Sequence, residues 1–203
     1  MKKPSIIFDL DGTLWDASRA IAKGWNDILP DRDPQLTPDD IRSVAGLPMV
    51  DIFKRLDIPF EEKIYHDLIE AEHLAINDMG ALLFDGVRET IEQLKTCYDL
   101  YIVSNCQQGY IELFLTKMKM TDNFLDHLCW GDTLLPKGQT IRRLMERHNI
   151  QSAVYIGDTR GDQRAAQEAG IPFIFVNYGY GEADEPVERI DAFGQLLEVF
   201  PCR

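Results

Sequence analysis

Two aspartates separated by one residue stand directly after a short apolar run near the start of the chain. The run, residues 5–8, is typical of a buried parallel strand, and it is followed by Asp9, Asp11, Gly12 and Thr13. Side chains two positions apart in an extended chain point to the same side, about 6.6 Å apart. The two carboxylates can therefore aim at one metal ion or one phosphorus atom, although aspartate and glycine are also common in ordinary turns.

Three later segments carry polar groups of the same kind at or after predicted strand ends. They supply a hydroxyl, an amide, a cation and further carboxylates: Ser104 and Asn105, then Lys137, then Asp158, with Asp162 four residues further on. Ligands of open parallel sheets bind beyond the carboxyl ends of the strands, so we expect these side chains to share one site. Each also has an ordinary alternative: Ser104 caps a strand end, Lys137 is a solvated turn residue, and the two aspartates lie in the first turn of a helix.

Charge indicates what else this site needs. Four ionised aspartates cannot share a pocket with a single lysine, because the repulsion between like charges is too costly. A divalent cation removes the conflict, and ligands that are all oxygen atoms suit Mg²⁺ best. The residues therefore predict a magnesium-dependent site for phosphoryl transfer.

The chain around these motifs shows two kinds of pattern. Apolar residues at helical spacing, broken by proline and glycine, predict that residues 16–80 are all helical, with helices over 18–29, from an N-cap at Thr37, around 52–56 and over 61–79. After residue 84, short apolar runs alternate with amphipathic segments. Strands are expected at 100–103, 127–130, 153–156 and 173–176, and helices at 87–96, 109–119, 140–148, 161–169 and 192–199.

This alternation predicts an α/β fold, a Rossmann-like parallel sheet with helices on both faces. We expect residues 1–15 and 81–203 to form this core catalytic domain. Residues 16–80 are expected to be an all-helical cap domain inserted into it, with hinges near Asp16 and near residues 82–86.

The composition excludes several classes of partner. With 34 acidic and 21 basic residues among 203, the formal net charge is −13, which repels nucleic acid and anionic membrane surfaces. No uncharged apolar run approaches the ~18 residues of a membrane span, and Asp9 and Asp11 interrupt any signal-peptide core. The four cysteines lack metal-type spacing and are interpreted as reduced thiols of a cytoplasmic protein. The sequence leaves the oligomeric state open.

The motifs together resemble those of haloacid-dehalogenase-like (HAD) superfamily phosphatases with a small helical (C1-type) cap. The resemblance covers nearly the whole chain and rests on four pieces in the family's order: Asp-Leu-Asp-Gly-Thr at 9–13, Ser104-Asn105, Lys137, and Gly-Asp-Thr-Arg-Gly-Asp at 157–162. Within the superfamily the chain looks most like phosphoglycolate-phosphatase-like members, supported loosely by residues 84–87 and 179–181. The cap is shorter than in many of them, so the sequence does not name the substrate.

The resemblance implies a role for each motif residue. Asp9 is the expected nucleophile, forming an aspartyl-phosphate, and Asp11 is the expected general acid and base. Phosphate binding is implied for Ser104, Asn105 and Lys137. Mg²⁺ binding is implied for the side chains of Asp9 and Asp158 and the backbone carbonyl of Asp11. Asp162 and Thr13 are expected to support these ligands without contacting the metal. These roles imply hydrolysis of small-metabolite phosphate monoesters.

Other functions stay open on the sequence. A phosphomutase of the β-phosphoglucomutase type would use the same residues to pass the phosphoryl group between positions on a sugar. A non-enzymatic phosphate-sensing protein can also combine acids, a hydroxyl and a lysine with Mg²⁺ on a parallel sheet, although receiver domains of this kind lack the Asp-Leu-Asp-Gly-Thr motif. A haloacid dehalogenase is disfavoured, because its nucleophile needs no metal and no acid at the position of Asp11.

Overall fold

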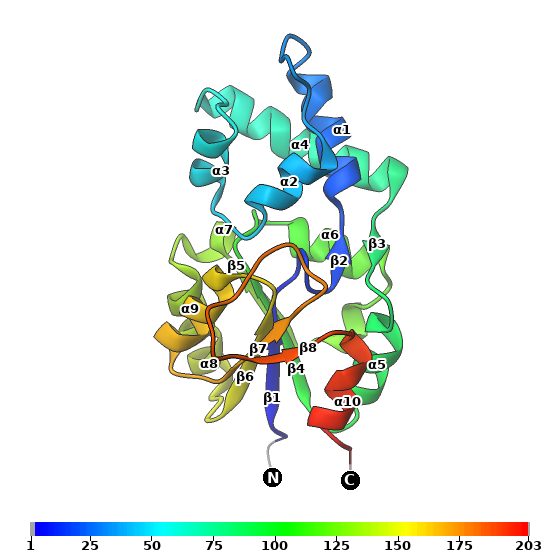
Figure 1. Cartoon of the computed structure of the whole chain (residues 1–203), viewed down its shortest axis with the longest axis vertical. Helices are drawn as coiled ribbons and strands as arrows, with labels where there is room; N and C mark the ends of the chain where they lie inside the picture. The colour runs from blue at the N-terminus through cyan, green and yellow to red at the C-terminus, as the bar shows by residue number, and fades with distance from the viewer. Residues whose placement is uncertain (1–2, 203) are drawn as a thin grey trace.

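A six-stranded parallel sheet forms the centre of the computed structural model, which describes residues 3–202 (Figure 1). The strands lie in the order β5-β4-β1-β6-β7-β8, and every neighbouring pair is parallel. Their bounds are β1 Ser5–Phe8, β4 Asp99–Ser104, β5 Asp126–Cys129, β6 Ala153–Gly157, β7 Phe173–Val176 and β8 Glu188–Ile190. The predicted α/β fold is confirmed.

Helices cover both faces of this sheet. They are α5 Val87–Leu94, α6 Tyr110–Lys117, α7 Trp130–Thr133, α8 Lys137–His148, α9 Arg160–Ala169 and α10 Leu196–Val199. Ile6 and Phe8 of β1 belong to one apolar cluster with residues of α5, α6 and α10, whereas Ile7 belongs to another with residues of α8 and α9. Figure 1 accordingly shows α8 and α9 on one side of the sheet and α5 and α10 on the other.

Four more helices lie together beyond the carboxyl end of β1, coloured blue to cyan in Figure 1. We call them the helical group: α1 Ser18–Ile28, α2 Pro38–Val44, α3 Met49–Arg55 and α4 Glu62–Met79. A two-stranded antiparallel ribbon, β2 Trp15–Asp16 with β3 Leu82–Leu83, carries the chain into and out of this group. Within residues 3–202 we find no helix with the length and hydropathy of a membrane span.

Local signals explain the bounds of these helices. Thr37 caps α2 as expected: its Oγ1 accepts a hydrogen bond from the Asp40 backbone N–H (3.2 Å), and the Asp40 carboxylate accepts one from the Thr37 N–H (2.8 Å). The glycine Gly24 lets α1 approach α4 closely, because a Cβ at this position would lie 2.5 Å from the Ala71 carbonyl oxygen.

The structure differs from the predicted elements at the short strands β2, β3 and β8, at the start of α8 and at the closing helix. The edge strand β8 has two exposed residues out of three and so carries no apolar alternation, and β2 and β3 are two residues each, too short for a pattern. Helix α8 begins at Lys137 rather than Thr140, which puts the lysine in the first turn of a helix. The closing helix is a 3₁₀ turn, Phe193–Gln195, followed by the short α10.

Two of the four cysteines are not free thiols, contrary to the prediction from the sequence. Cys97, after α5, and Cys202, near the C-terminus, form a disulfide with Cα atoms 5.7 Å apart. The end of the chain returns to this place, where the rings of Tyr98 and Phe200 pack with centroids 5.7 Å apart. Cys106 and Cys129 are free. A separation of 105 residues hides such a pairing from the sequence.

A buried acid lies between α1 and α4. The side chain of Glu72 is 6% exposed, and the indole N–H of Trp25 donates a hydrogen bond to its Oε2 (3.2 Å). Burial raises the pKa of Glu72 from 4.5 to about 8, and the negative charge of Asp11 adds to the rise. The folded protein therefore keeps a proton on Glu72 at neutral pH.

The close contact between α1 and α4 at Gly24 predicts that a larger side chain at this position destabilises the protein. Gly24→Leu should lower the free energy of unfolding by ~1–3 kcal/mol, because the new side chain must displace the Ala71 backbone. Urea unfolding measures the change. The control Lys23→Leu places the same side chain at the exposed neighbouring position and should change stability much less. Equal urea midpoints for Gly24→Leu and the unchanged protein would contradict this packing.

Glu72 predicts a specific pH dependence of stability. Between pH 4.5 and about 8 the unfolded chain releases the Glu72 proton while the folded protein holds it, so this group lowers stability as pH rises through that range. Glu72→Gln removes the effect. The stability of this variant relative to the unchanged protein should rise by ~1 kcal/mol or more from pH 5 to pH 8. Urea unfolding at both pH values tests this, with the exposed Glu70→Gln as control; parallel pH slopes for all three proteins would refute it.

Candidate active site

Lys137 and Asp9 form a buried ion pair at the carboxyl end of β1. The lysine ammonium lies 2.9 Å from Asp9 Oδ1 and 2.6 Å from Asp162 Oδ1, and all three side chains are at most 5% exposed. Burial alone would lower the pKa of Lys137, but Asp162 and Asp9 outweigh it and raise that pKa. The lysine therefore stays charged and fixes two carboxylates that are 153 positions apart in the sequence, since 162 − 9 = 153.

Three buried carboxylates converge on one point. Asp9, Asp158 and Asp162 each offer an oxygen within 4.8 Å of the others. Asp9 follows β1, Asp158 follows β6, and Asp162 lies in the first turn of α9. The two central strands are paired in register, with Phe8 opposite Ile156, so their ends meet. The predicted convergence of these strand ends is present in the structure.

This acidic group lacks positive charge. Burial, together with the charge of Asp162, raises the pKa of Asp9 to about 7 although Lys137 opposes the shift, and the same two causes raise the pKa of Asp158 well above its ordinary value. Asp9 Oδ2 is buried and has no hydrogen-bond partner among the described residues. Three carboxylates beside one ammonium fit a divalent cation that prefers oxygen ligands.

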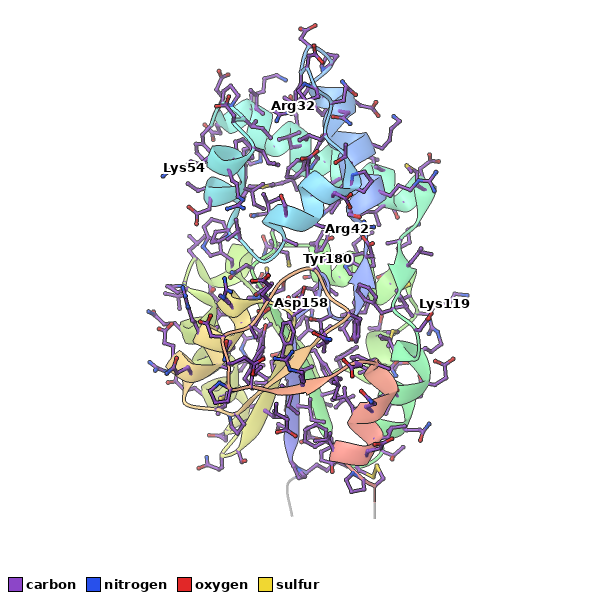
Figure 2. All side chains as sticks on the ribbon, in the orientation of Figure 1. Arg32, Arg42, Lys54, Lys119, Asp158 and Tyr180 are labelled. Atoms are coloured by element: carbon purple, nitrogen blue, oxygen red, sulfur yellow. A yellow bond between two sulfur atoms is a disulfide. The ribbon has the colours of Figure 1, made fainter. Side chains whose placement is uncertain are left out.

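A glycine-rich loop after β7 packs closely against Asp158. The backbone N–H of Tyr180 donates to Asp158 Oδ2 (2.7 Å), and Thr13 Oγ1 donates to its Oδ1 (3.3 Å). A Cβ on Gly12 or on Gly179 would lie 2.2 Å from Asp158 atoms, so both positions exclude any side chain. In Figure 2 the labelled side chains of Asp158 and Tyr180 lie where the sheet meets the helical group. Residues 179–181 supported the family resemblance only loosely, because glycine and tyrosine carry no local signal for a contact with a carboxylate.

Asp11 lies outside the acidic group and has different neighbours. Its Oδ1 accepts hydrogen bonds from the Tyr110 hydroxyl (2.8 Å) and from the Trp15 indole N–H (3.0 Å). Burial raises its pKa to about 6, while these two donors lower it. The two aspartates of the first motif are therefore held by separate sets of groups. The sequence did not identify Tyr110 and Trp15 as site residues, because aromatic residues in apolar segments are typical of a hydrophobic core.

Ser104 and Asn105 end the strand next to β1. Ile102 of β4 pairs with Phe8 of β1. Ser104 follows two residues later and is therefore level with Leu10, which stands between Asp9 and Asp11 in the sequence. Ser104 is buried, and the Asn105 amide donates to the Gly46 carbonyl oxygen (2.7 Å) in the helical group. All predicted site residues thus lie at one edge of the sheet, and Asn105 also contacts the helices above it.

A cavity of 80 Å³ lies between these strand ends and the helical group. Asp11, Ser104 and Asn105 line it from the sheet side. From the helical group, Trp25 and Met49 are among the residues that line it, whereas Arg42 does not line it and pairs with Asp16 (2.7 Å). Glu72, which the sequence did not single out, also lines the cavity.

Comparisons with known proteins agree with this geometry. The family model described as haloacid dehalogenase-like hydrolase matches residues 6–176. The phosphoglycolate phosphatase of Rhodobacter capsulatus is 31% identical over 193 residues, covering 87% of this chain and 85% of that protein. The phosphoglycolate phosphatase of Colwellia psychrerythraea is 28% identical over 224 residues and covers 97% and 96%.

Solved structures show the same fold. The crystal structure of a predicted phosphoglycolate phosphatase from Haemophilus somnus has a TM-score of 0.83 at 22% identity and covers 98% of both chains. A haloacid dehalogenase-like family hydrolase from Streptococcus pneumoniae has a TM-score of 0.81 at 23% identity, again with 98% of both chains covered. On the family match over residues 6–176 and the Rhodobacter relative, this chain belongs to the haloacid dehalogenase-like hydrolase family.

Proposed function

We propose that the protein is a Mg²⁺-dependent phosphatase of small phosphate monoesters that works through an aspartyl-phosphate. The observation that carries the proposal is the state of Asp9: buried, held through Oδ1 by Lys137, and free at Oδ2. A carboxylate fixed by one oxygen presents the other as a nucleophile in a constant position. The phosphatase names of the relatives support the same reaction class.

The acidic group supplies the metal ligands in this proposal. The side chains of Asp9 and Asp158 and the backbone carbonyl of Asp11 would hold Mg²⁺. Asp162 supports the site from behind, since Lys137 donates to its Oδ1 (2.6 Å) and the Thr159 hydroxyl donates to its Oδ2 (2.6 Å). When bound, the ion offsets the charge of the phosphoryl group and of the neighbouring carboxylates.

The two aspartates of the first motif divide the chemistry. Asp9 attacks phosphorus, and the bond between phosphorus and the ester oxygen breaks while Asp11 gives its proton to the departing alcohol. Asp11 then takes a proton from the water that hydrolyses the aspartyl-phosphate. A pKa of about 6 for Asp11 supports this role, because the group can both hold and release a proton near neutral pH. Lys137, Ser104 and the Asn105 amide bind the phosphoryl oxygens.

The helical group acts as a cap in this proposal, residues 16–80 closing over a core of residues 1–15 and 81–203. Two contacts support a closed arrangement: Asn105 donates to the Gly46 carbonyl (2.7 Å), and the Tyr65 hydroxyl donates to Gln107 Oε1 (2.6 Å). The ribbon of β2 and β3 is the natural hinge, because only these short segments connect the two parts. Closure excludes water other than the one that reacts.

The first test is a phosphate-release screen over small phosphate monoesters, with and without Mg²⁺. Release should require the metal, and Asp9→Asn should reduce it by roughly 10³-fold or more, because the nucleophile is lost. Asp122→Asn, the same change at an exposed position, should keep full activity. Comparable turnover by Asp9→Asn removes the proposed nucleophile. Release that depends on added sugar bisphosphate favours a phosphomutase instead.

The second test separates proton transfer from binding. Asp11→Asn should lower kcat by roughly 10²–10⁴-fold for alkyl phosphates while inorganic phosphate still binds in the presence of Mg²⁺, as measured by calorimetry. The decrease in the rate of aspartyl-phosphate formation should be smaller for acetyl phosphate, because its leaving carboxylate needs no proton. Unchanged steady-state rates with alkyl phosphates would be incompatible with the acid and base role of Asp11.

A further inference from the structure

The cavity above the strand ends contains a buried acid and no basic side chain. None of the described residues that line it is lysine, arginine or histidine. Its walls toward the helical group are mostly apolar, with Ile21, Met49 and Ile52 among them, and Trp25 of α1 and Glu72 of α4 also belong to these walls. A ligand bound through its phosphoryl group at the sheet therefore extends its other end toward Glu72.

Glu72 has no counter-ion within residues 3–202. Its one hydrogen bond comes from the Trp25 indole N–H (3.2 Å). Two cations of the described chain pair with other acids: Arg42 with Asp16 and Asp39 (2.7 and 2.8 Å), and Lys137 with Asp9 and Asp162. A cation brought by a ligand would favour the ionised form of Glu72, so that the acid releases the proton it otherwise holds and faces the cation as a carboxylate.

A second polar group points to a ligand at the same place. The side chain of Ser18 lines the cavity, its residue is 2% exposed, and its Oγ has no hydrogen-bond partner among the described residues. A buried hydroxyl without a partner is costly, and a ligand N–H group would satisfy it. The rings of Trp25 and Tyr110 line the same cavity and offer the aromatic surface that attracts organic cations.

The size of the cavity limits the ligand. A cavity of 80 Å³ is small, so the part of the substrate beyond the phosphate is compact. A carboxylate in this part would face Glu72 and Asp11 with no basic residue to neutralise it. The glycolate named for the relatives carries such a carboxylate.

We propose that the leaving group is a compact amino alcohol, whose cationic nitrogen lies beside Glu72 and donates to Ser18 Oγ. The preferred substrate is then the phosphate ester of this alcohol, and phosphoglycolate is a poor one. This inference rests on the proposed phosphatase function, since the phosphoryl group must lie at Asp9. The specificity comes from charge complementarity within a site that excludes water.

A binding experiment with matched two-carbon phosphates tests the inference without turnover. Calorimetry with the Asp9→Asn protein and Mg²⁺ compares 2-aminoethyl phosphate, 2-hydroxyethyl phosphate and 2-phosphoglycolate. The amine should bind about tenfold or more tighter than each of the other two. Adding Glu72→Gln should remove most of this preference, whereas adding Glu70→Gln, the same change on the exposed face of α4, should leave it intact.

The outcomes separate the inference from the proposed function. Equal affinity for the amine and the neutral alcohol, tightest binding of phosphoglycolate, or no binding of any of the three overturns the amino-alcohol inference. Hydrolysis of the same series by the unchanged protein is then measured. A binding preference for the amine without phosphate release supports the inference and contradicts the phosphatase proposal. Phosphate release at equal rates from the amine and the neutral alcohol, with no effect of Glu72→Gln on the ratio of these two rates, supports the phosphatase proposal and contradicts the amino-alcohol inference.

Discussion

The arrangement of the whole site depends on one buried ammonium group. Lys137 contacts the carboxylates of Asp9 and Asp162, and without it these acids would repel each other in a place that water does not reach. One positive charge does not balance Asp9, Asp158 and Asp162, so the folded chain retains an excess of negative charge. This imbalance favours a divalent cation at the end of β1, which is the role of Mg²⁺ in the proposed function.

The same few residues give two carboxylates different properties. Asp9 lies among other acids and a lysine, whereas Asp11 receives hydrogen bonds from an indole and a phenol. The strand β1 ends at Phe8 and the chain turns over residues 12–14, so the two side chains do not share one set of neighbours. In the proposed function, nucleophile and proton donor thus come from one turn at the end of this strand.

In the proposed function the helical group adds selectivity to the end of the sheet that binds phosphate. Polar contacts join it to the core, such as those of Asn105 with Gly46 and of Tyr65 with Gln107, beside the ring contact of His73 with Tyr110. The cavity that it closes has an acid where a carboxylate-binding enzyme needs a base. Within one family fold, the residues that line such a cavity can change the substrate while the chemistry stays the same.

The sequence by itself determined the α/β fold, the bounds of most helices and the location of the motif residues. Apolar periodicity and capping residues act over a few positions, so they can be read locally, as in α2 and β6. The tertiary structure alone decided the contacts of Asp11 with Tyr110, of Asp158 with Tyr180 and of Glu72 with Trp25, and the disulfide between Cys97 and Cys202. These partners lie 22 to 105 positions apart, and nothing in the local pattern of either residue specifies the other. They meet only because the packing of helices on the sheet brings their segments together.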